Sequence, residues 1–217
     1  MADKKKLICF DVDGTLTKNK SGFYSLTVGL GCPVEEVISA YERTKKGEIS
    51  IAEGEGIVTK IYCESGKASQ DNIFGIFDAM PLKRDAPNLF KHLKETGYLI
   101  YLVSGGIDMY VEMVAKKTGA DGFFHNASLE FKKNGNLKRI CYQGNEGPTK
   151  VKQIGLLADK VGIDIGKIVF VGDSENDYEA FCATKHGIAV HPFDEKLDAV
   201  AWKKIKILSE IKEILQN

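Results

Sequence analysis

Short apolar runs, separated by longer segments with helical periodicity, dominate the pattern of hydrophobic and polar positions along the chain. Four runs stand out, at residues 7–10, 98–103, 168–171 and 187–190. Short, continuous apolar runs are typical of parallel strands that are buried on both faces of a sheet. A weaker run at 122–124 predicts a further short strand.

The segments between these runs place their apolar side chains on one face of a helix. Residues 86–96 show this spacing and are followed by Gly97, a residue well suited to end a helix. The same spacing predicts helices over 108–118 and 150–161. Strand, helix and strand with short links indicate a parallel sheet. The sequence therefore predicts an α/β, Rossmann-like core whose parallel sheet is flanked by helices.

Residues 18–82 interrupt this alternation. They contain no clear buried-strand run, and their longest helical segment covers 34–46, where Pro33 is placed to start a helix. We expect a small helical cap domain inserted after the first strand, with the core formed by 1–17 and 83–217. An insertion at this position would overhang the carboxyl end of the first strand and act as a lid.

Two segments of the predicted core have patterns of their own. Residues 128–143 alternate in polarity around Asn134-Gly135-Asn136, which predicts a β-hairpin. Near the end of the sequence, an apolar stripe from Ile205 to Leu215 predicts the buried face of one helix.

Composition argues against several classes of function. Lys and Arg together number 30, as do Asp and Glu, so the charge gives no basis for binding nucleic acid or a membrane surface. No stretch approaches the roughly 18 consecutive apolar residues of a membrane span. The five cysteines have neither CxxC nor zinc spacing, which favours a reducing compartment. We expect a cytoplasmic protein that is a monomer or a homodimer.

Polar groups directly follow three of the predicted strands. Asp11 and Asp13 follow the first, Ser104 and Gly105 the second, and Asp173 the third. Because ligands of such sheets bind beyond the carboxyl ends of the strands, we expect these groups to converge. Two neighbouring carboxylates repel each other unless a cation or a shared proton offsets them. This pattern points to a hard divalent metal, to acid–base chemistry, or to both.

A lysine and a polar turn extend this set. The segment Gly147-Pro148-Thr149-Lys150 opens a helix, and Lys150 is the candidate phosphate-binding cation, with Lys152 as the alternative. The turn after the third strand adds Ser174, Asn176 and Asp177 as further candidate site residues. Together these groups match what phosphoryl transfer needs: a nucleophile, metal ligands, phosphate-binding groups and an acid–base residue.

These motifs closely resemble those of the haloacid dehalogenase superfamily of phosphatases. Asp11-Val12-Asp13-Gly14-Thr15, Ser104, Lys150 and Gly172 to Asp177 occur in the family's order, and the resemblance extends over nearly the whole chain. By pattern, the nearest subgroup is that of the phosphoserine phosphatases. The insertion at 18–82 looks like the C1-type cap of that family.

The resemblance implies a role for each matching residue. Asp11 would form an aspartyl-phosphate, and Asp13 would be the general acid and base. Mg²⁺ would be held by Asp11, the main-chain carbonyl of Asp13, and Asp173. Phosphate would be bound by Ser104 with the neighbouring main chain at Gly105, and by Lys150. Asp177 would orient Lys150 or a metal-bound water, with Ser174 and Asn176 beside it.

The cap interval departs from the pattern of relatives that hydrolyse phosphoserine. Those relatives place an acidic residue shortly after the first motif, where this chain has Lys18-Asn19-Lys20. They also place an arginine in the cap, but the comparable segment 49–60 has none. A lysine would repel the substrate's ammonium group, which argues against phosphoserine. An anionic or partly aromatic substrate is favoured by Lys18, Lys20, Phe23 and Tyr24.

The sequence thus predicts a Mg²⁺-dependent phosphomonoester hydrolase that acts on a small phosphorylated metabolite. Two alternatives stay open. A phosphotransferase or mutase would use the same Asp11 nucleophile but pass the phosphoryl group to an organic acceptor. A non-catalytic phospho-ligand-binding protein would keep the fold, although it would have no use for a nucleophile.

Overall fold

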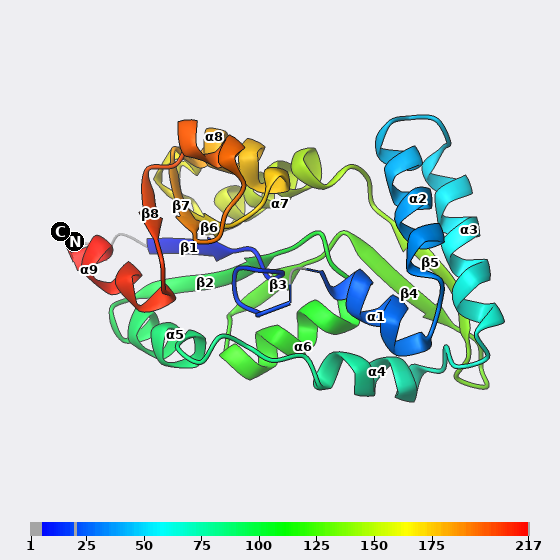
Figure 1. Cartoon of the computed structure of the whole chain (residues 1–217). Coiled ribbons are helices and arrows are strands. Elements are labelled where there is room, and N and C mark those ends of the chain that lie inside the picture. Colours follow the sequence, from blue (N-terminus) through cyan, green and yellow to red (C-terminus); the bar gives the residue numbers. More distant parts are fainter. Residues whose placement is uncertain (1–5, 20, 217) are drawn as a thin grey trace.

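A computed structural model describes residues 6–19 and 21–216, and a parallel β-sheet forms its centre (Figure 1). Within the described residues this sheet has six strands in the order β3-β2-β1-β6-β7-β8, and all pairs are parallel. The order reverses between β1 and β6, as in doubly wound sheets. The strands are β1 (Lys6–Phe10), β2 (Tyr98–Val103), β3 (Gly122–Phe124), β6 (Val169–Gly172), β7 (His186–Val190) and β8 (Lys203–Ile205).

Side chains of β1 alternate between two apolar layers, one on each face of the sheet. Leu7 and Cys9 pack against the helices of one face, and Ile8 and Phe10 pack against those of the other. The first face is covered by α7 (Glu146–Val161) and α8 (Tyr178–Thr184). The second is covered by α5 (Ala86–Glu95), α6 (Asp108–Thr118) and α9 (Ile211–Gln216). Burial on both faces explains the continuous apolar runs and confirms the predicted fold class.

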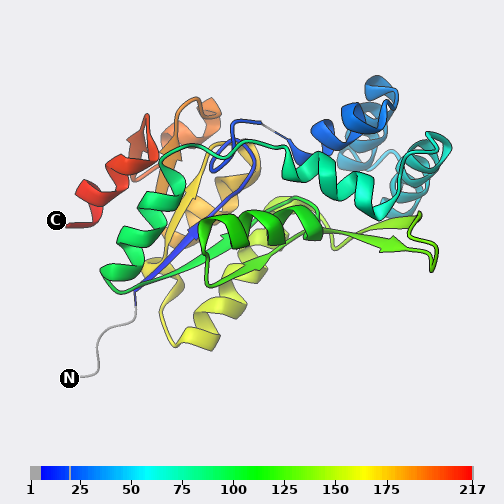
Figure 2. The ribbon, with the colours of Figure 1, turned by 90° about the horizontal axis from the view of Figure 1, so that it is seen from below.

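Four helices, among the residues that the structure describes, lie beyond the carboxyl ends of the strands (Figures 1 and 2). A hydrogen bond of 2.7 Å joins the hydroxyls of Thr27 and Tyr62 inside this layer. The side chain of Ser50 accepts from the main chain of Glu53 and the Glu53 carboxylate accepts in return, which closes the first turn of the third helix. The helices are α1 (Gly22–Leu30), α2 (Val34–Lys45), α3 (Ile51–Glu64) and α4 (Gln70–Asp78).

The predicted hairpin is present and extends from the core to these helices (Figure 2). Its strands are β4 (Ala127–Phe131) and β5 (Leu137–Tyr142), which pair in antiparallel fashion. On β5, the main-chain N–H of Ile140 donates to Thr59 of α3 at 3.0 Å. The hairpin therefore lies with the helical layer in space, although it follows α6 in the sequence.

Two chain segments connect the helical layer to the core, and they run side by side. Thr17 and Leu82 form an antiparallel bridge. The N–H of Lys83 donates to the carbonyl of Leu16 at 2.8 Å. The insertion thus leaves and re-enters the core at one place. The expected limits of the cap, 18–82, remain a prediction.

Differences from the predicted elements concentrate near the C-terminus. Ile205 belongs to β8 and pairs with Val190, so the apolar stripe from Ile205 to Leu215 is not one helix. Two of the three β8 residues are lysines, so β8 lacks the apolar run that indicates a buried strand. Charged residues are typical of strands at the edge of a sheet. The helix predicted from residue 150 begins earlier, at Glu146. Across the described ranges, no helix is both long and apolar enough to cross a membrane.

Candidate active site

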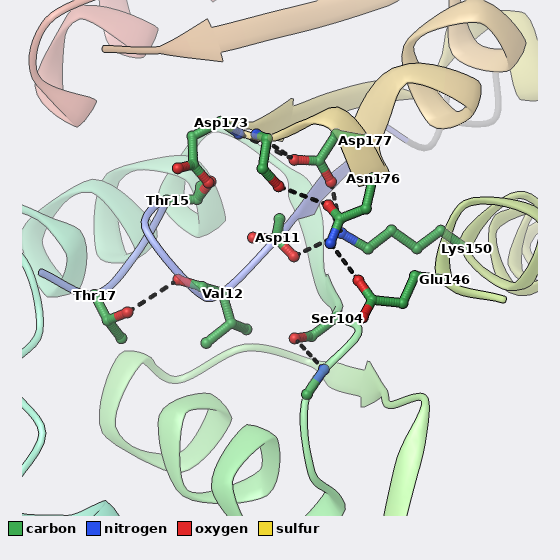
Figure 3. A network of polar contacts seen from close by, with 12 residues as sticks. Asp11, Val12, Thr15, Thr17, Ser104, Glu146, Lys150, Asp173, Asn176 and Asp177 are labelled. Carbon is green, nitrogen blue, oxygen red and sulfur yellow. Dashed lines mark hydrogen bonds and ion pairs between the residues drawn. The ribbon is translucent and has the colours of Figure 1, made fainter. Parts of the chain in front are cut away.

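The candidate site lies at the carboxyl ends of β1, β2 and β6, where the order of the sheet reverses (Figure 3). Asp11 follows β1 directly and is 3% exposed, and its N–H donates to the carbonyl of Val171 on β6 at 2.8 Å. Ser104 follows β2, and Asp173 follows β6. The structure thus brings together the three strand ends that the sequence indicated.

Lys150 is the cation at the centre of this site. It is 1% exposed, and its Nζ donates to Asp11 Oδ1 at 2.7 Å, to Asp177 Oδ1 at 2.6 Å and to Asn176 Oδ1 at 3.2 Å. Burial by itself lowers the pKa of Lys150, but the attraction of Asp11 and Asp177 outweighs it and the net pKa is raised. Lys152 is exposed, so of the two candidates Lys150 is the one in the site.

Negative charge exceeds positive charge around Lys150. One carboxylate oxygen from each of Asp11, Asp173 and Asp177 lies within 4.8 Å of the others. Burial raises the pKa of Asp11 well above its usual range, and the neighbouring carboxylates raise it further while Lys150 opposes them. Burial and Asp177 raise the pKa of Asp173 to about 6. A divalent cation would relieve this excess charge.

The oxygen donors of the cluster fit a hard divalent cation. Lys150 occupies Oδ1 of Asp11, whereas no hydrogen bond from the described residues reaches Oδ2 of Asp11. Both oxygens of Asp177 are engaged, one by Lys150 and the other by the main-chain N–H groups of Asp173 and Ser174 at 3.0 and 3.1 Å. Asp11 and Asp173 are therefore better placed to bind a metal than Asp177, which orients Lys150.

Gly14 and Thr15 shape the turn that brings the first motif against Asp173. Gly14 has φ 75°, and a Cβ at this position would overlap the Asp173 carboxylate. The hydroxyl of Thr15 donates to Asp173 Oδ1 at 3.1 Å. Glycine is thus required both by the backbone conformation and by the close approach.

Asp13 lies beside Tyr110, which the sequence did not single out. The phenol of Tyr110 donates to Asp13 Oδ1 at 3.0 Å and to Thr17 Oγ1 at 3.3 Å. Burial raises the pKa of Asp13 to about 6, although hydrogen bonds from the Gly22 main chain and from Tyr110 oppose the rise. A carboxyl group with a pKa near neutrality is suited to general acid–base catalysis.

Ser104 and Gly105, which follow β2, line a cavity at this site together with Asp11 and Asp13. The Oγ of Ser104 accepts from the Gly106 N–H at 3.0 Å, so its own hydrogen can be donated to a ligand. Asn126 is a second site residue that the sequence did not reveal. It is 2% exposed and donates to the Gly144 carbonyl at 2.9 Å, while its Oδ1 has no partner among the described residues.

Ser174 and Asn176 connect the turn after β6 to α7. The hydroxyl of Ser174 donates to Asn176 Oδ1 at 2.7 Å, and the amide nitrogen of Asn176 donates to Glu146. Glu146 also accepts a hydrogen bond of 3.5 Å from Tyr41 of α2. The sequence did not indicate Glu146, although it lies directly before the segment that carries Lys150.

A cavity of about 820 Å³ lies between the core groups and the helices α1, α2 and α3. Asp11, Asp13, Ser104 and Asn176 lie on its core side. Phe23 and Tyr24, which the sequence indicates as candidate substrate contacts, also line it, and the Phe23 ring stacks on Tyr142 of β5 at 5.6 Å. Lys18 is exposed and is not among the residues that line the cavity, and Lys20 lies outside the described residues.

Comparison with known proteins agrees with this geometry. A family model described as "Hydrolase: haloacid dehalogenase-like hydrolase" matches residues 5–183. The chain belongs to this family. The predicted resemblance to haloacid dehalogenase phosphatases is thereby confirmed, including the phosphoserine-phosphatase-like subgroup, which its relatives represent.

Three known proteins illustrate what this haloacid dehalogenase-like chain is similar to. Phosphoserine phosphatase of Archaeoglobus fulgidus is 31% identical over 176 residues, which cover 80% of this chain and 49% of that protein. The chain therefore spans about half of that relative's length. The 2-hydroxy-3-keto-5-methylthiopentenyl-1-phosphate phosphatase of Exiguobacterium sibiricum is 26% identical to this chain. The match covers 90% of this chain and 94% of that protein. A solved structure titled "Phospho-Aspartyl Intermediate Analogue of Phosphoserine phosphatase" matches with TM-score 0.78 and 27% identity, covering 98% and 99% of the two chains.

Proposed function

We propose that this protein is a Mg²⁺-dependent phosphomonoester hydrolase that acts through an aspartyl-phosphate on Asp11. The observation that carries the proposal is the buried contact of 2.7 Å between Lys150 and Asp11, within a carboxylate cluster at the base of a large cavity. A protein that merely binds a phosphorylated ligand does not need a carboxylate nucleophile beside its cation.

In the first step, Lys150 and Ser104 would hold the phosphate oxygens while the Asp11 carboxylate attacks the substrate phosphorus. Asp11 forms a bond to phosphorus and the ester bond to the leaving oxygen breaks. Asp13, in its protonated form, gives its proton to that oxygen. A Mg²⁺ ion, held by Asp11, the Asp13 carbonyl and Asp173, would offset the charge of the carboxylates and the phosphate when bound.

In the second step, Asp13 acts as the base. It takes a proton from a water molecule, which attacks phosphorus and releases phosphate from Asp11. Tyr110 holds Asp13 in place through the hydrogen bond of 3.0 Å in both steps. Lys150 stays paired with Asp177 at 2.6 Å and so keeps its position as the charge on Asp11 changes.

The cavity favours a substrate other than phosphoserine. Lys45 is the one cation among the described lining residues, and it lies 3.4 Å from Glu175. The Lys45 side chain is exposed, so its attraction for a substrate carboxylate would be screened by solvent. The names of relatives include both phosphoserine and methylthiopentenyl phosphate phosphatases, so related proteins differ in leaving group.

Phosphate release from a panel of phosphorylated metabolites tests the proposal. Wild type should release phosphate with Mg²⁺ and lose this activity with a chelator. Asp11→Asn should be inactive, and hydroxylamine should trap an acyl-phosphate in wild type alone. Persistent activity in Asp11→Asn would overturn the mechanism.

Product analysis with added alcohols distinguishes the two alternatives. Transfer of phosphate to an alcohol in preference to water would indicate a phosphotransferase or mutase. Tight, metal-dependent binding of a phosphorylated compound with no turnover would indicate a binding protein.

A further inference from the structure

The cavity above the catalytic groups has an apolar wall that the phosphoryl-transfer chemistry does not require. Among the described residues, ten large apolar or aromatic side chains are exposed, and four of them line this cavity. These four come from α1, α2 and α3, and they are Tyr24, Ile38, Tyr41 and Ile51. Clustered exposed apolar side chains mark binding surfaces, whereas isolated ones are ordinary.

Further apolar groups complete the wall around these four. Phe23 and Tyr142 stack there, and Val34, Val37 and Val58 also line the cavity. The wall belongs to the helical layer and the hairpin, while the phosphate-binding groups belong to the core. A substrate with its phosphate on Lys150 would therefore project its leaving group between apolar side chains.

Charge in the cavity disfavours an anionic leaving group. Besides Asp11 and Asp13, four carboxylates line it, from Glu55, Glu146, Glu175 and Glu179. Several of them have partners within the protein. Glu55 accepts from the Tyr142 N–H at 2.5 Å, Glu146 accepts from Asn176, and Glu175 is paired with Lys45. Their negative charge repels an anionic leaving group, and these three side chains already have hydrogen-bond or ion-pair partners within the protein.

We infer that the substrate is a phosphate monoester of an uncharged, predominantly apolar alcohol. This inference rests on the proposed phosphatase function and adds the class of leaving group. The apolar wall binds the alcohol by removing its surface from water, and the carboxylates exclude alcohols that carry a carboxylate or a second phosphate.

Hydrolysis of ethyl, butyl and hexyl phosphate by the full chain with Mg²⁺ tests the inference. These alcohols have similar acidity, so differences in kcat/KM report contacts rather than leaving-group chemistry. Each buried methylene should raise kcat/KM by about threefold to fourfold until the wall is filled. A carboxylate at the end of the hexyl chain should lower kcat/KM more than about tenfold.

A pair of variants locates the effect in the wall. Ile38→Ser removes an apolar side chain that lines the cavity, and Val28→Ser removes one that is exposed on α1 away from it. Both positions are on helix surfaces, so both variants should fold, which thermal unfolding will verify. Ile38→Ser should weaken the increase with chain length, and Val28→Ser should preserve it.

The outcomes separate the inference from the proposed function. If no monoester is hydrolysed, phosphoserine included, the proposed function fails. If phosphate is released but kcat/KM does not increase from ethyl to hexyl phosphate, the inferred substrate class alone is wrong. Higher kcat/KM for phosphoserine or phosphocholine than for hexyl phosphate would also overturn it, in favour of a charged leaving group.

Discussion

Removal of the Tyr110 hydroxyl tests whether this phenol tunes the acid–base residue. In wild type the phenol donates to Asp13 Oδ1 at 3.0 Å, and the pKa of Asp13 is raised to about 6 by burial. The hydrogen bond stabilises the charged carboxylate, so Tyr110→Phe should raise this pKa further. A hydrogen bond to a charged group contributes about 1.5–3 kcal/mol, and Gly22 retains its own bond to Asp13. We expect a rise of about one to two pKa units, since one unit corresponds to about 1.4 kcal/mol.

The pH dependence of kcat/KM reports this change. Formation of the phosphoenzyme requires protonated Asp13, so kcat/KM should fall as pH rises through the pKa of Asp13. In Tyr110→Phe that fall should move to higher pH by about one to two units. In kcat, if phosphoenzyme hydrolysis limits the rate, the ascending limb should move in the same direction, because that step needs the ionised carboxylate.

Tyr62→Phe is the matched control. Tyr62 is also buried and its hydroxyl also bonds a threonine, Thr27 at 2.7 Å, but it lies within the helical layer. It should alter stability without moving the pH profile. An unchanged profile in Tyr110→Phe, or an equal shift in both variants, would refute the assignment of Tyr110 to Asp13.

Three further predictions follow from the charges of the site. Lys150→Met should lower kcat/KM at least about 10²-fold, and Lys152→Met should stay within about twofold of wild type, as measured by phosphate release. Because the pKa of Asp173 is raised from 3.8 to about 6, the folded chain loses stability as pH rises across that window. Without divalent metal at about pH 7.5, the free energy of unfolding of Asp173→Asn should therefore exceed that of wild type by about 1–3 kcal/mol. Its melting temperature should be higher, and a lower melting temperature would contradict this. Mg²⁺ at about 100 times its Kd should stabilise wild type by about 2.7 kcal/mol and Asp173→Asn much less, as thermal unfolding will show.

The core of the fold was predictable because its signals are local. A strand buried on both faces needs a continuous apolar run, and Asp11, Ser104 and Asp173 each follow such a run directly. The edge strand β8 gives no such signal, since two of its three residues are lysines. The sequence pattern therefore predicts a helix at Ile205, where the structure has β8.

The walls of the cavity were less predictable because they depend on contacts between distant segments. Lys18 is close to the first motif in sequence, yet it does not line the cavity. Tyr142 is 131 residues from Asp11 in sequence, yet it stacks on Phe23 there. The contact between Tyr110 and Asp13 was not predictable either, because nothing in the sequence of an amphipathic helix indicates where a tyrosine hydroxyl lies.

The paired segments at Thr17 and Leu82 have a consequence for protein engineering. Because the chain leaves and re-enters the core at one place, we expect the residues between these points to be exchangeable as a unit. Recombination with a related protein would have to transfer the hairpin 127–142 as well, since β5 binds α3 through Ile140 and Tyr142. A chimaera built from both pieces would carry the donor's selectivity on this chain's phosphate-transfer centre.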